Sequence, residues 1–492
     1  MLLVASLPCE RDGFRRSAAT MNQTRVHAFT EDDPLADHDA VRLAQLIREG
    51  EVSSSELVEA AIARAERVQS VLRGIELPLF DQARVQANRK TEGYFAGVPS
   101  FIKDNTDIQG HPTRFGSLAV PEKPATHDGA FARQFLSAGF ILLGKTRLPE
   151  FGFNCSTEFE GLAPTTNPWN IEYSCGGSSG GAAALVAAGV VPVAHANDGG
   201  GSIRIPAACC GLVGLKVSRG RFVTPEIARS LPINVVCDGI VSRTVRDTAH
   251  FVAAAERFHR NPALPPVGLI EGPSTRRFKI GLMTDSITGP PCPETLATVE
   301  RTANLLETLG HSVKRLSTLP VTSAFADDFI DYWGFLAWIT GRLGKKTFGK
   351  DFLSEKMDSF VKGLASRFRS RAWKLPMALY RLKRTQKDYA NYMHGLDAIL
   401  MPVLGHVTPK LGYISPDVPF EELMSRLSAY AAYTPLDNAA GTPAIALPIG
   451  LSVQGLPIGI QLASAIGDER TLLELAYELE QANPWPRIQA LP

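Results

Sequence analysis

The stretch of residues 174–216 constrains the fold of this chain more than any other part. It reads SCGGSSGGAAALVAAGVVPVAHANDGGGSIRIPAACCGLVGLK, which is rich in glycine, alanine and serine and poor in charge. Small uncharged side chains favour burial, and glycine permits backbone conformations that are closed to other residues. We therefore expect this stretch to lie inside the molecule, with residues 180–196 forming a buried helix that runs into a strand.

The rest of the chain alternates between the helical period and short apolar strands. Helical spacing marks residues 37–69 (two helices), 130–138, 293–309, 320–395 and 469–482. Strand patterns mark residues 97–103, 140–143, 278–282, 398–403, 444–448 and 458–462. This alternation, without an internal repeat or a low-complexity linker, predicts one large α/β domain.

Charge and length bound the class of partner. The 492 residues carry 51 basic and 50 acidic side chains, for a formal net charge of +1. A balance so close to zero gives no global attraction to nucleic acid or to an anionic membrane. No apolar run is long enough to cross a bilayer. We therefore expect a small-molecule substrate, with no nucleic-acid or membrane partner.

The seven cysteines predict a reducing compartment. Their number is odd and they are scattered, so a disulfide framework is not expected and a cytoplasmic location fits better. There is no Cys-x-x-Cys pair and no His-x-x-x-His pair, so we expect no metal and no other cofactor. At the N-terminus the apolar run precedes the arginines, the reverse of a signal peptide, and residues 1–30 are expected to be a disordered extension.

Two short motif matches point to other chemistries and fail on context. The segment of residues 139–146, GFILLGKT, has the letters of a phosphate-binding loop, but four consecutive large apolar residues indicate a buried strand. The segment of residues 177–181, GSSGG, resembles the nucleophile elbow of serine–histidine hydrolases with imperfect spacing. His250, His394 and His406 lie downstream, so a serine–histidine mechanism stays open as the alternative.

Two serine–glycine clusters and one lysine form a candidate catalytic set. Ser178 and Ser202 each lie among glycines, and three consecutive glycines precede Ser202. Consecutive glycine amides can point at one spot beside a serine, as an oxyanion hole requires. Lys103 follows an apolar strand pattern, and a desolvated lysine has a lowered pKa and can act as a base. A serine hydroxyl needs such a base to become nucleophilic.

The same stretch resembles the signature of the amidase signature family, approximately GGSSGGSAA, then D-x-GGSIR-x-PA, then CG-x-x-GLK. Matches fall at residues 176–181, Asp198, residues 200–204, Pro206, Ala207, Cys210, Gly211 and residues 214–216. The likeness extends over residues 35–250 and 395–485 and is weak over 255–390. The phrase HAND at residues 195–198 resembles the branch of actinobacterial amidases and 6-aminohexanoate cyclic-dimer hydrolase.

This resemblance implies a fold and a domain organisation. The family fold is one large α/β domain, a mixed twisted β-sheet covered by helices on both faces. It would span residues 31–492, with the catalytic core at about 95–250 and 395–485. A variable helical region at about 290–395 would contribute to substrate binding.

The resemblance also implies the roles of the site residues. Ser202 is similar to the acylated nucleophile, Ser178 to a bridging serine after a cis peptide bond, and Lys103 to the general base. Backbone amides of Gly199, Gly200, Gly201 and Ser202 would form the oxyanion hole. Asn197 departs from the family pattern, where Thr or Ser is more common, and His195 is expected to pack behind the loop. The expected pocket residues are Phe151, Phe153, Cys155, Thr157, Gly177 and Trp333, with Phe335 and Trp338 as further candidates.

The implied activity is hydrolysis of linear carboxylic amides through an acyl-enzyme. Esters, carbamates (a urethanase activity) and cyclic oligoamides suit the same chemistry, and a homodimer is compatible with the sequence. One alternative is a glutaminase-type amidotransferase subunit that works with partner chains. Another is a non-catalytic interaction protein that uses the basic residues 362–384, although a solvated helical face is the favoured explanation of that segment.

Overall fold

The centre of the molecule is an eight-stranded sheet in the order β10-β9-β11-β13-β12-β7-β8-β6. The computed structural model describes residues 24–490 of the chain. The strands of this sheet are β6 (Val193–Asp198), β7 (Val213–Lys216), β8 (Cys237–Ser242), β9 (Lys279–Leu282), β10 (Ser312–Arg315), β11 (Ala398–Pro402), β12 (Ala444–Leu451) and β13 (Pro457–Ser464). The pairs β10–β9 and β9–β11 are parallel and the others antiparallel, so the sheet is mixed.

A second sheet of three strands brings a lysine to the edge of the first. Its order is β1 (Ile75–Pro78), β3 (Ile141–Thr146), β2 (Pro99–Lys103), and β2 runs parallel to β3. Side chains join β2 to β6: Ser100 Oγ donates to Val193 O (2.9 Å), and the Lys103 backbone N–H donates to His195 Nδ1 (3.1 Å). The last residue of β2 is therefore held against the end of the large sheet. A short pair, β4 (Thr166–Asn167) and β5 (Asn170–Ser174), completes the strands of the described residues.

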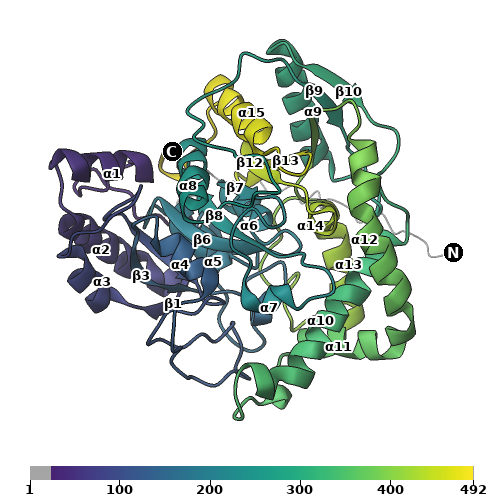
Figure 1. Cartoon of the computed structure of the whole chain (residues 1–492), viewed down its shortest axis with the longest axis horizontal. Helices are drawn as coiled ribbons and strands as arrows, with labels where there is room; N and C mark the ends of the chain where they lie inside the picture. The colour runs from purple at the N-terminus through teal and green to yellow at the C-terminus, as the bar shows by residue number, and fades with distance from the viewer. Residues whose placement is uncertain (1–23, 491–492) are drawn as a thin grey trace.

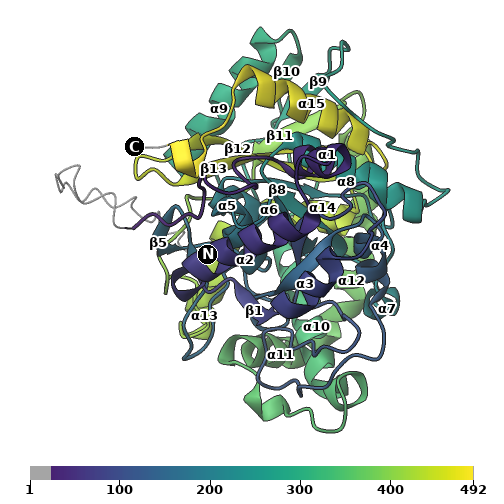
Figure 2. The ribbon, with the colours of Figure 1, turned by 90° about the vertical axis from the view of Figure 1, so that its left-hand side faces the viewer.

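Helices cover both faces of the large sheet, as the sequence predicts. Figure 2 shows α9 (Pro293–Thr308) and α15 (Glu469–Ala482) on one face and α5 (Gly180–Ala187) and α6 (Arg204–Cys210) on the other. All residues of α5 and α6 are buried, because alanine, glycine and cysteine present little surface that needs water. The remaining helices around these layers are α1 (Ala40–Glu49), α2 (Ser54–Leu72), α3 (Phe80–Ala87), α4 (Ala130–Leu136), α7 (Glu226–Arg229), α8 (Val245–Phe258) and α14 (Pro435–Ala440). Single 3₁₀ turns lie at Glu150–Gly152, Ser354–Lys356, Ala372–Lys374 and Ile488–Ala490.

The apolar segment at residues 139–146 is a strand, as its side chains indicate. β3 is buried along its whole length, and Lys145 Nζ contacts Asp104 Oδ1 (2.8 Å), Thr113 Oγ1 (2.7 Å) and Pro112 O (2.8 Å). Its ammonium group is thus committed to the protein interior. A phosphate-binding loop would need an open nest of backbone amides before a helix, and this segment has neither.

A group of long helices packs beside the sheet layers, at the right and bottom of Figure 1. It contains α10 (Phe325–Thr347), α11 (Ser359–Arg371), α12 (Leu375–Tyr392) and α13 (Phe420–Tyr430). Part of the basic segment 362–384 is not a free solvated face. Arg371 Nε lies 2.9 Å from Asp331 Oδ1 and Arg381 Nε lies 2.6 Å from Asp328 Oδ2, so both arginines hold their helices to α10.

The expected N-terminal extension falls mostly outside the described residues, which begin at Thr24. From there the backbone follows the body of the protein: the Val26 N–H donates to Pro168 O (2.9 Å) and the Ala28 N–H to Ala188 O (2.7 Å). Among residues 24–490, no helix combines the length and the apolar character that a membrane crossing requires.

Candidate active site

Lys103 lies at the end of β2 with its amine completely buried. The side chain is 0 % exposed, and Nζ lies 2.7 Å from Ser178 Oγ, 2.9 Å from Ser179 Oγ and 2.6 Å from Asn197 Oδ1. β2 delivers the lysine from the small sheet, whereas β6 and the turn before α5 supply the three oxygen atoms around it. The amine of Lys103 thus meets a small polar cage inside an apolar core.

Burial leaves the amine of Lys103 partly uncharged at neutral pH. Desolvation lowers the pKa of its amine to about 7, against the opposing charges of Asp238 and Asp198. A neutral amine has two N–H donors and one lone pair. Asn197 Oδ1 can only accept, and Ser179 already donates towards Asn197 O (3.3 Å), so these two take the donors. The lone pair is then left for the hydroxyl proton of Ser178.

The turns that carry Ser178 and Ser202 are joined by a backbone hydrogen bond from Ser179 to Ser202. Ser178 follows the cis peptide bond Gly177–Ser178 and is 2 % exposed. The Ser179 N–H donates to Ser202 O (3.3 Å), which holds the two serine-containing turns together. Among residues 24–490, no hydrogen bond joins the hydroxyls of Ser178 and Ser202 directly. The structure therefore brings Lys103 and Ser178 into contact and places Ser202 beside them, at 9 % exposure and facing a pocket.

Asp198 and Arg204 form the frame of the loop that carries Ser202. Asp198 Oδ2 accepts from Arg204 Nε (2.9 Å), and both groups are 0 % exposed. Burial alone would raise the pKa of Asp198, but the guanidinium charge and the hydrogen bonds hold this pKa well below its usual range. Arg204 also donates to Asp437 Oδ2 (3.0 Å) and Asn438 Oδ1 (2.6 Å) of α14. This buried network fixes the loop against the sheet.

The glycine amides before Ser202 are not equivalent. Within the described chain, the backbone N–H groups of Gly199, Gly200 and Ser202 have no protein acceptor. The Gly201 N–H donates instead to Asp198 Oδ1 at 2.7 Å. We therefore correct the expectation for Gly201: its amide stabilises the loop from inside, because the buried carboxylate of Asp198 competes for it. Amides free to meet an oxyanion belong to Gly199, Gly200 and Ser202.

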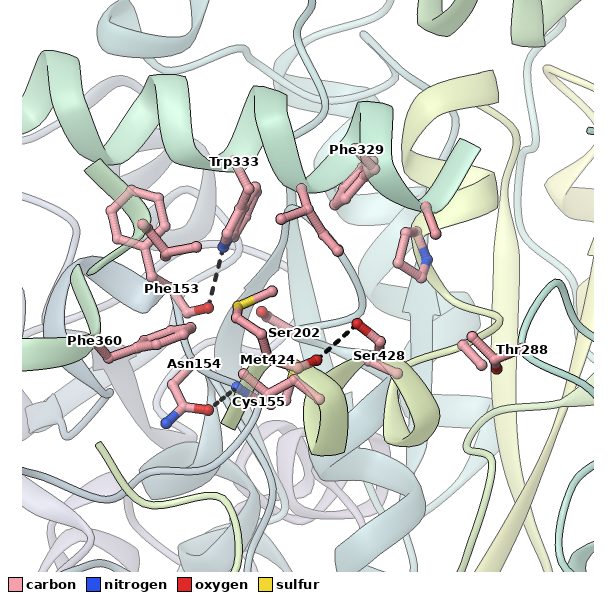
Figure 3. A pocket seen from close by; sticks show the side chains of 18 of the residues that line it. Phe153, Asn154, Cys155, Ser202, Thr288, Phe329, Trp333, Phe360, Met424 and Ser428 are labelled. Atoms are coloured by element: carbon pink, nitrogen blue, oxygen red, sulfur yellow. Dashed lines mark hydrogen bonds between the residues drawn. The ribbon is translucent and has the colours of Figure 1, made fainter. Parts of the chain in front are cut away.

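An uncharged pocket opens onto Ser202 (Figure 3). The space between its walls, including the part open to solvent, is about 860 Å³. Figure 3 shows Phe329 and Trp333 pointing down from one helix, α10, over Ser202, with Met424 and Ser428 of α13 below. Aliphatic and aromatic side chains dominate the wall, and none of the lining residues carries a charge. The arrangement suits a neutral, largely apolar substrate.

Three of the six expected pocket residues line this pocket. They are Phe153, Cys155 and Trp333, and the Trp333 indole N–H donates to Phe153 O (3.1 Å). The other three do not. Phe151 packs against Phe115, Phe348 and Phe352; Thr157 donates from Oγ1 to Gly176 O (2.9 Å); and Gly177 lies against the backbone of Cys155 and Ser156. Close position in the sequence does not set the direction of a side chain, and Phe151 has a positive φ of 50° that turns it away.

Sequence reasoning missed part of the wall that α10 and α13 supply. Phe325 and Phe329 precede Trp333 at intervals of four residues, so the helical period could have identified them from Trp333. Phe335 and Trp338, the further candidates, face away and contact Phe368. Met424, Leu427 and Ser428 of α13 carry no motif, and only the tertiary structure brings them to the site.

The alternative chemistries find no support in the geometry. Among residues 24–490, neither Ser178 nor Ser202 hydrogen-bonds to a histidine; His250 Nδ1 pairs with Arg246 O (2.9 Å) and His406 Nδ1 with Val407 O (2.8 Å). Over the same residues, no group of three or more His, Cys, Asp or Glu side chains is arranged to hold a metal ion. Within the described residues, the titratable group that contacts the Ser178 hydroxyl is Lys103.

Comparison with known proteins assigns the family. The sequence model of the family described as Amidase matches residues 56–473. The chain is 47% identical to a putative amidase AmiC of Mycobacterium leprae, over 94% of this chain and 99% of the relative. It is 34% identical to a 6-aminohexanoate-cyclic-dimer hydrolase of Paenarthrobacter ureafaciens, over 91% and 95%. A solved structure of 6-aminohexanoate cyclic dimer hydrolase superposes with a TM-score of 0.80 at 31% identity, covering 92% of this chain and 98% of that one.

Proposed function

The chain belongs to the amidase signature family and is a hydrolase of carbon–nitrogen bonds, and on this premise we propose that it cleaves neutral carboxylic amides through an acyl-enzyme on Ser202. The family resemblance found in the sequence is confirmed by the match over residues 56–473. The proposal concerns the parts that family membership leaves open: the residues that carry the reaction, the substrate class and the need for partners.

The proposed reaction begins with the uncharged amine of Lys103. It takes a proton from Ser178, which takes one from Ser202 as Ser202 Oγ attacks the amide carbonyl carbon. The resulting oxyanion is stabilised by the free amides of Gly199, Gly200 and Ser202. Ser178 then returns a proton to the leaving amine. Water, activated by the same chain of groups, attacks the acyl carbon and releases the carboxylic acid.

One observation carries this proposal. The Lys103 amine is fully buried and lies 2.7 Å from Ser178 Oγ, beside a pocket that contains Ser202. A lysine kept from water without a carboxylate partner is costly unless its amine can be neutral. Lys145 is the internal contrast, because it is equally buried but contacts the carboxylate of Asp104 at 2.8 Å. Lys103 has hydroxyl and amide oxygens in that place, as a base requires.

The substrate class follows from the wall of the pocket. An uncharged, aromatic lining accepts an aryl or aliphatic acyl group, and offers no counter-ion to an α-amino acid. We propose neutral amides first, including cyclic oligoamides like the substrate in the name of the relative that is 34% identical. Esters and carbamates suit the same acyl transfer. A glutaminase is disfavoured, because glutamine would place an ammonium and a carboxylate in a pocket without charged partners.

The proposed location is the cytoplasm. All six cysteines of the described residues are free, which suits a reducing environment. A neutral small molecule reaches its enzyme by diffusion without electrostatic attraction, which agrees with the near-zero net charge of the chain.

A substrate panel tests the function. Purified wild-type protein and Ser202→Ala are assayed side by side on aryl amides, aliphatic amides, cyclic oligoamides, esters, carbamates and glutamine. We expect hydrolysis of neutral amides by the wild type and a loss of roughly 10⁴-fold or more in Ser202→Ala. Equal activity in the two proteins, or a preference for glutamine, would overturn the proposal.

A further inference from the structure

Side chains of strand β6 accept hydrogen bonds from both the backbone N–H and the side-chain amine of Lys103. His195 Nδ1 accepts from the Lys103 backbone N–H (3.1 Å), and Asn197 Oδ1 accepts from Lys103 Nζ (2.6 Å). His195 and Asn197 are two residues apart on the strand, so their side chains lie on the same face. No ladder hydrogen bond pairs β2 with β6, and the imidazole takes the place of a backbone carbonyl. His195 is therefore part of the scaffold that aims the lysine.

Asp238 stands behind this arrangement on the neighbouring strand. It is the cross-strand partner of Asn197 in the β6–β8 pair, and its Oδ1 lies 3.2 Å from His195 Nε2. Because the backbone N–H of Lys103 occupies Nδ1, the imidazole proton is on Nε2 and is donated to Asp238. The other carboxylate oxygen, Asp238 Oδ2, is buried and has no hydrogen-bond partner. The charge of a carboxylate with one oxygen unpaired in an apolar interior is weakly screened, so it stabilises a nearby cation.

We propose that the His195–Asp238 pair is a positioning device for the general base: His195 aims Lys103, and the carboxylate of Asp238 sets how readily the amine of Lys103 accepts a proton. The inference rests on the proposed role of Lys103. It explains a buried histidine and a buried aspartate that take no part in the acyl transfer itself. Both are positioning residues, because they act through Lys103 and do not contact the pocket.

Of the charged groups around Lys103, Asp238 has the strongest influence on whether the amine is protonated. Burial lowers the pKa of the Lys103 amine to about 7, and Asp238 is the larger of the two carboxylate influences that oppose this shift, ahead of Asp198. The second carboxylate, Asp198, is neutralised by Arg204 at 2.9 Å. Burial also lowers the pKa of His195, so its ring is neutral and leaves the charge of Asp238 uncompensated.

Among residues 24–490, the elements that pack on the pair contribute aromatic rings, serine hydroxyls, one thiol and one lysine amine. α4 contributes the rings of Phe131 and Phe135, at 4.9 and 5.9 Å from the imidazole, and the turn before α5 contributes serines. The neighbouring strands contribute Cys237, whose pKa is raised by burial, and Lys216, whose pKa is lowered by burial. Lys216 Nζ donates to Val217 O (3.0 Å), and the charged or ionisable groups that influence its amine most are Cys237, Arg204 and Asp198, in that order.

The protein contains a matched control for this pair. His311 Nδ1 accepts from the Phe278 backbone N–H (3.0 Å), and His311 Nε2 lies 2.8 Å from Glu478 Oε2. The arrangement of backbone donor, buried imidazole and carboxylate is the same, but it joins the residue before β9 to α15, and none of its three residues lines the pocket or hydrogen-bonds to Lys103. Glu478 differs in that Arg277 also reaches it, at 3.2 Å. A purely structural histidine–carboxylate pair should behave alike in both places.

The experiment compares the pH dependence of kcat/KM in wild type, Asp238→Asn and Glu478→Gln on one neutral amide. Removing the negative charge makes the protonated amine less favourable, so the pKa of Lys103 falls and the acidic limb of Asp238→Asn moves to lower pH by about one unit. Its plateau falls as well, because a weaker base removes the proton less effectively. Glu478→Gln keeps the wild-type limb. An Asp238→Asn limb that coincides with that of the wild type overturns the inference.

A second variant keeps the test valid if Asp238→Asn does not fold. In His195→Asn, the new amide oxygen can still accept from the Lys103 N–H, but the donor to Asp238 is lost. A buried carboxylate without any hydrogen bond takes up a proton, so the acidic limb moves in the same direction. His311→Asn is its control and leaves the limb in place. An unmoved limb in folded His195→Asn rules the inference out.

Failure of this inference is distinct from failure of the proposed function. If wild type shows an acidic limb that disappears with Lys103→Met but is unmoved in the Asp238 and His195 variants, Lys103 remains the base and only the pair loses its role. If Lys103→Met or Ser202→Ala retains wild-type activity, the proposed function itself is wrong, whatever the pair does.

Discussion

At the scale of single residues, Lys103 decides what the site can do. An ordinary lysine is charged at neutral pH, whereas burial lowers the pKa of this one to about 7. Only the neutral form is a base, so activity should rise with pH through about 7 and reach a plateau above it. We predict such an acidic limb in kcat/KM for any uncharged amide, and measurement between pH 5 and 9 checks it. A rate independent of pH over this range would contradict the account.

Lys103→Met removes the base while preserving an unbranched side chain of similar length. We expect turnover to fall by roughly 10³-fold, since general-base catalysis contributes about 10²- to 10⁴-fold. Single-turnover assays on the folded variant measure the loss. Lys145→Met serves as the comparison for a buried lysine outside the site: it breaks the contact with Asp104 and should reduce stability much more than the rate for molecules that remain folded.

Substitutions at the adjacent residues Gly200 and Gly201 test whether catalysis depends on the backbone conformation of the loop before Ser202. A methyl group on Gly201 would lie 2.3 Å from Thr434 Oγ1 and 2.7 Å from Ile205 Cδ1, at a φ of 131° that side chains rarely adopt. A methyl group on Gly200 would meet Phe329 at an ordinary 3.5 Å. We predict that Gly201→Ala lowers kcat by roughly 100-fold, as expected for a displaced catalytic loop, and that Gly200→Ala changes kcat much less. Similar kcat values for the two variants would argue against this view of the loop.

At the scale of elements, α10 determines both the wall of the pocket and its attachment to the core. Trp333 and Phe329 stack with ring centroids 5.7 Å apart, directly over Gly199 and Gly200. We predict that Trp333→Ala raises KM for an aryl amide by about tenfold through lost apolar contact. The acidic limb should stay where it is, because no charge near Lys103 changes. A shifted limb, or an unchanged KM, would show that this helix plays another role.

The ion pairs that join α10 to α11 differ in burial and should differ in strength. Asp331 is 3% exposed and lies 2.9 Å from Arg371, whereas Asp327 is 61% exposed and lies 2.8 Å from Arg367. We predict that Asp331→Ala lowers the free energy of unfolding by about 2 kcal/mol, less than a fully buried pair because Arg371 is partly solvated. Asp327→Ala should change it by about 0.5 kcal/mol or less. Equal effects in denaturant unfolding would contradict this ranking.

Local patterns in the sequence predicted the helices and strands whose conformation depends mainly on their own residues. The helical period over residues 37–69 corresponds to α1 and α2, and the apolar run at 139–146 contains the buried strand β3. The sequence did not predict the direction of individual backbone and side-chain groups, or which distant helices would meet. The Gly201 amide turns inwards to Asp198, and α13 joins the pocket wall from about 220 residues beyond Ser202, because long-range packing rather than local periodicity sets both.

At the scale of the whole molecule, the mixed sheet with helices on both faces agrees with the predicted fold. The division into a core at 95–250 and 395–485 and a variable region at 290–395 stays a prediction, as does the homodimer. The pocket offers glutamine no charged partner, so we predict that the purified chain hydrolyses neutral amides without any added partner. Light scattering with activity assays on the same fractions tests this, and activity that requires a second kind of chain would favour an amidotransferase.

The most direct test of the central claim is the rate at which a fluorophosphonate labels the enzyme as pH is varied, followed by peptide mapping. The account predicts a single adduct on Ser202, formed at a rate that rises through about pH 7 and collapses in Lys103→Met. An adduct on any other residue, or equally fast labelling of Ser202 without the lysine, would contradict it.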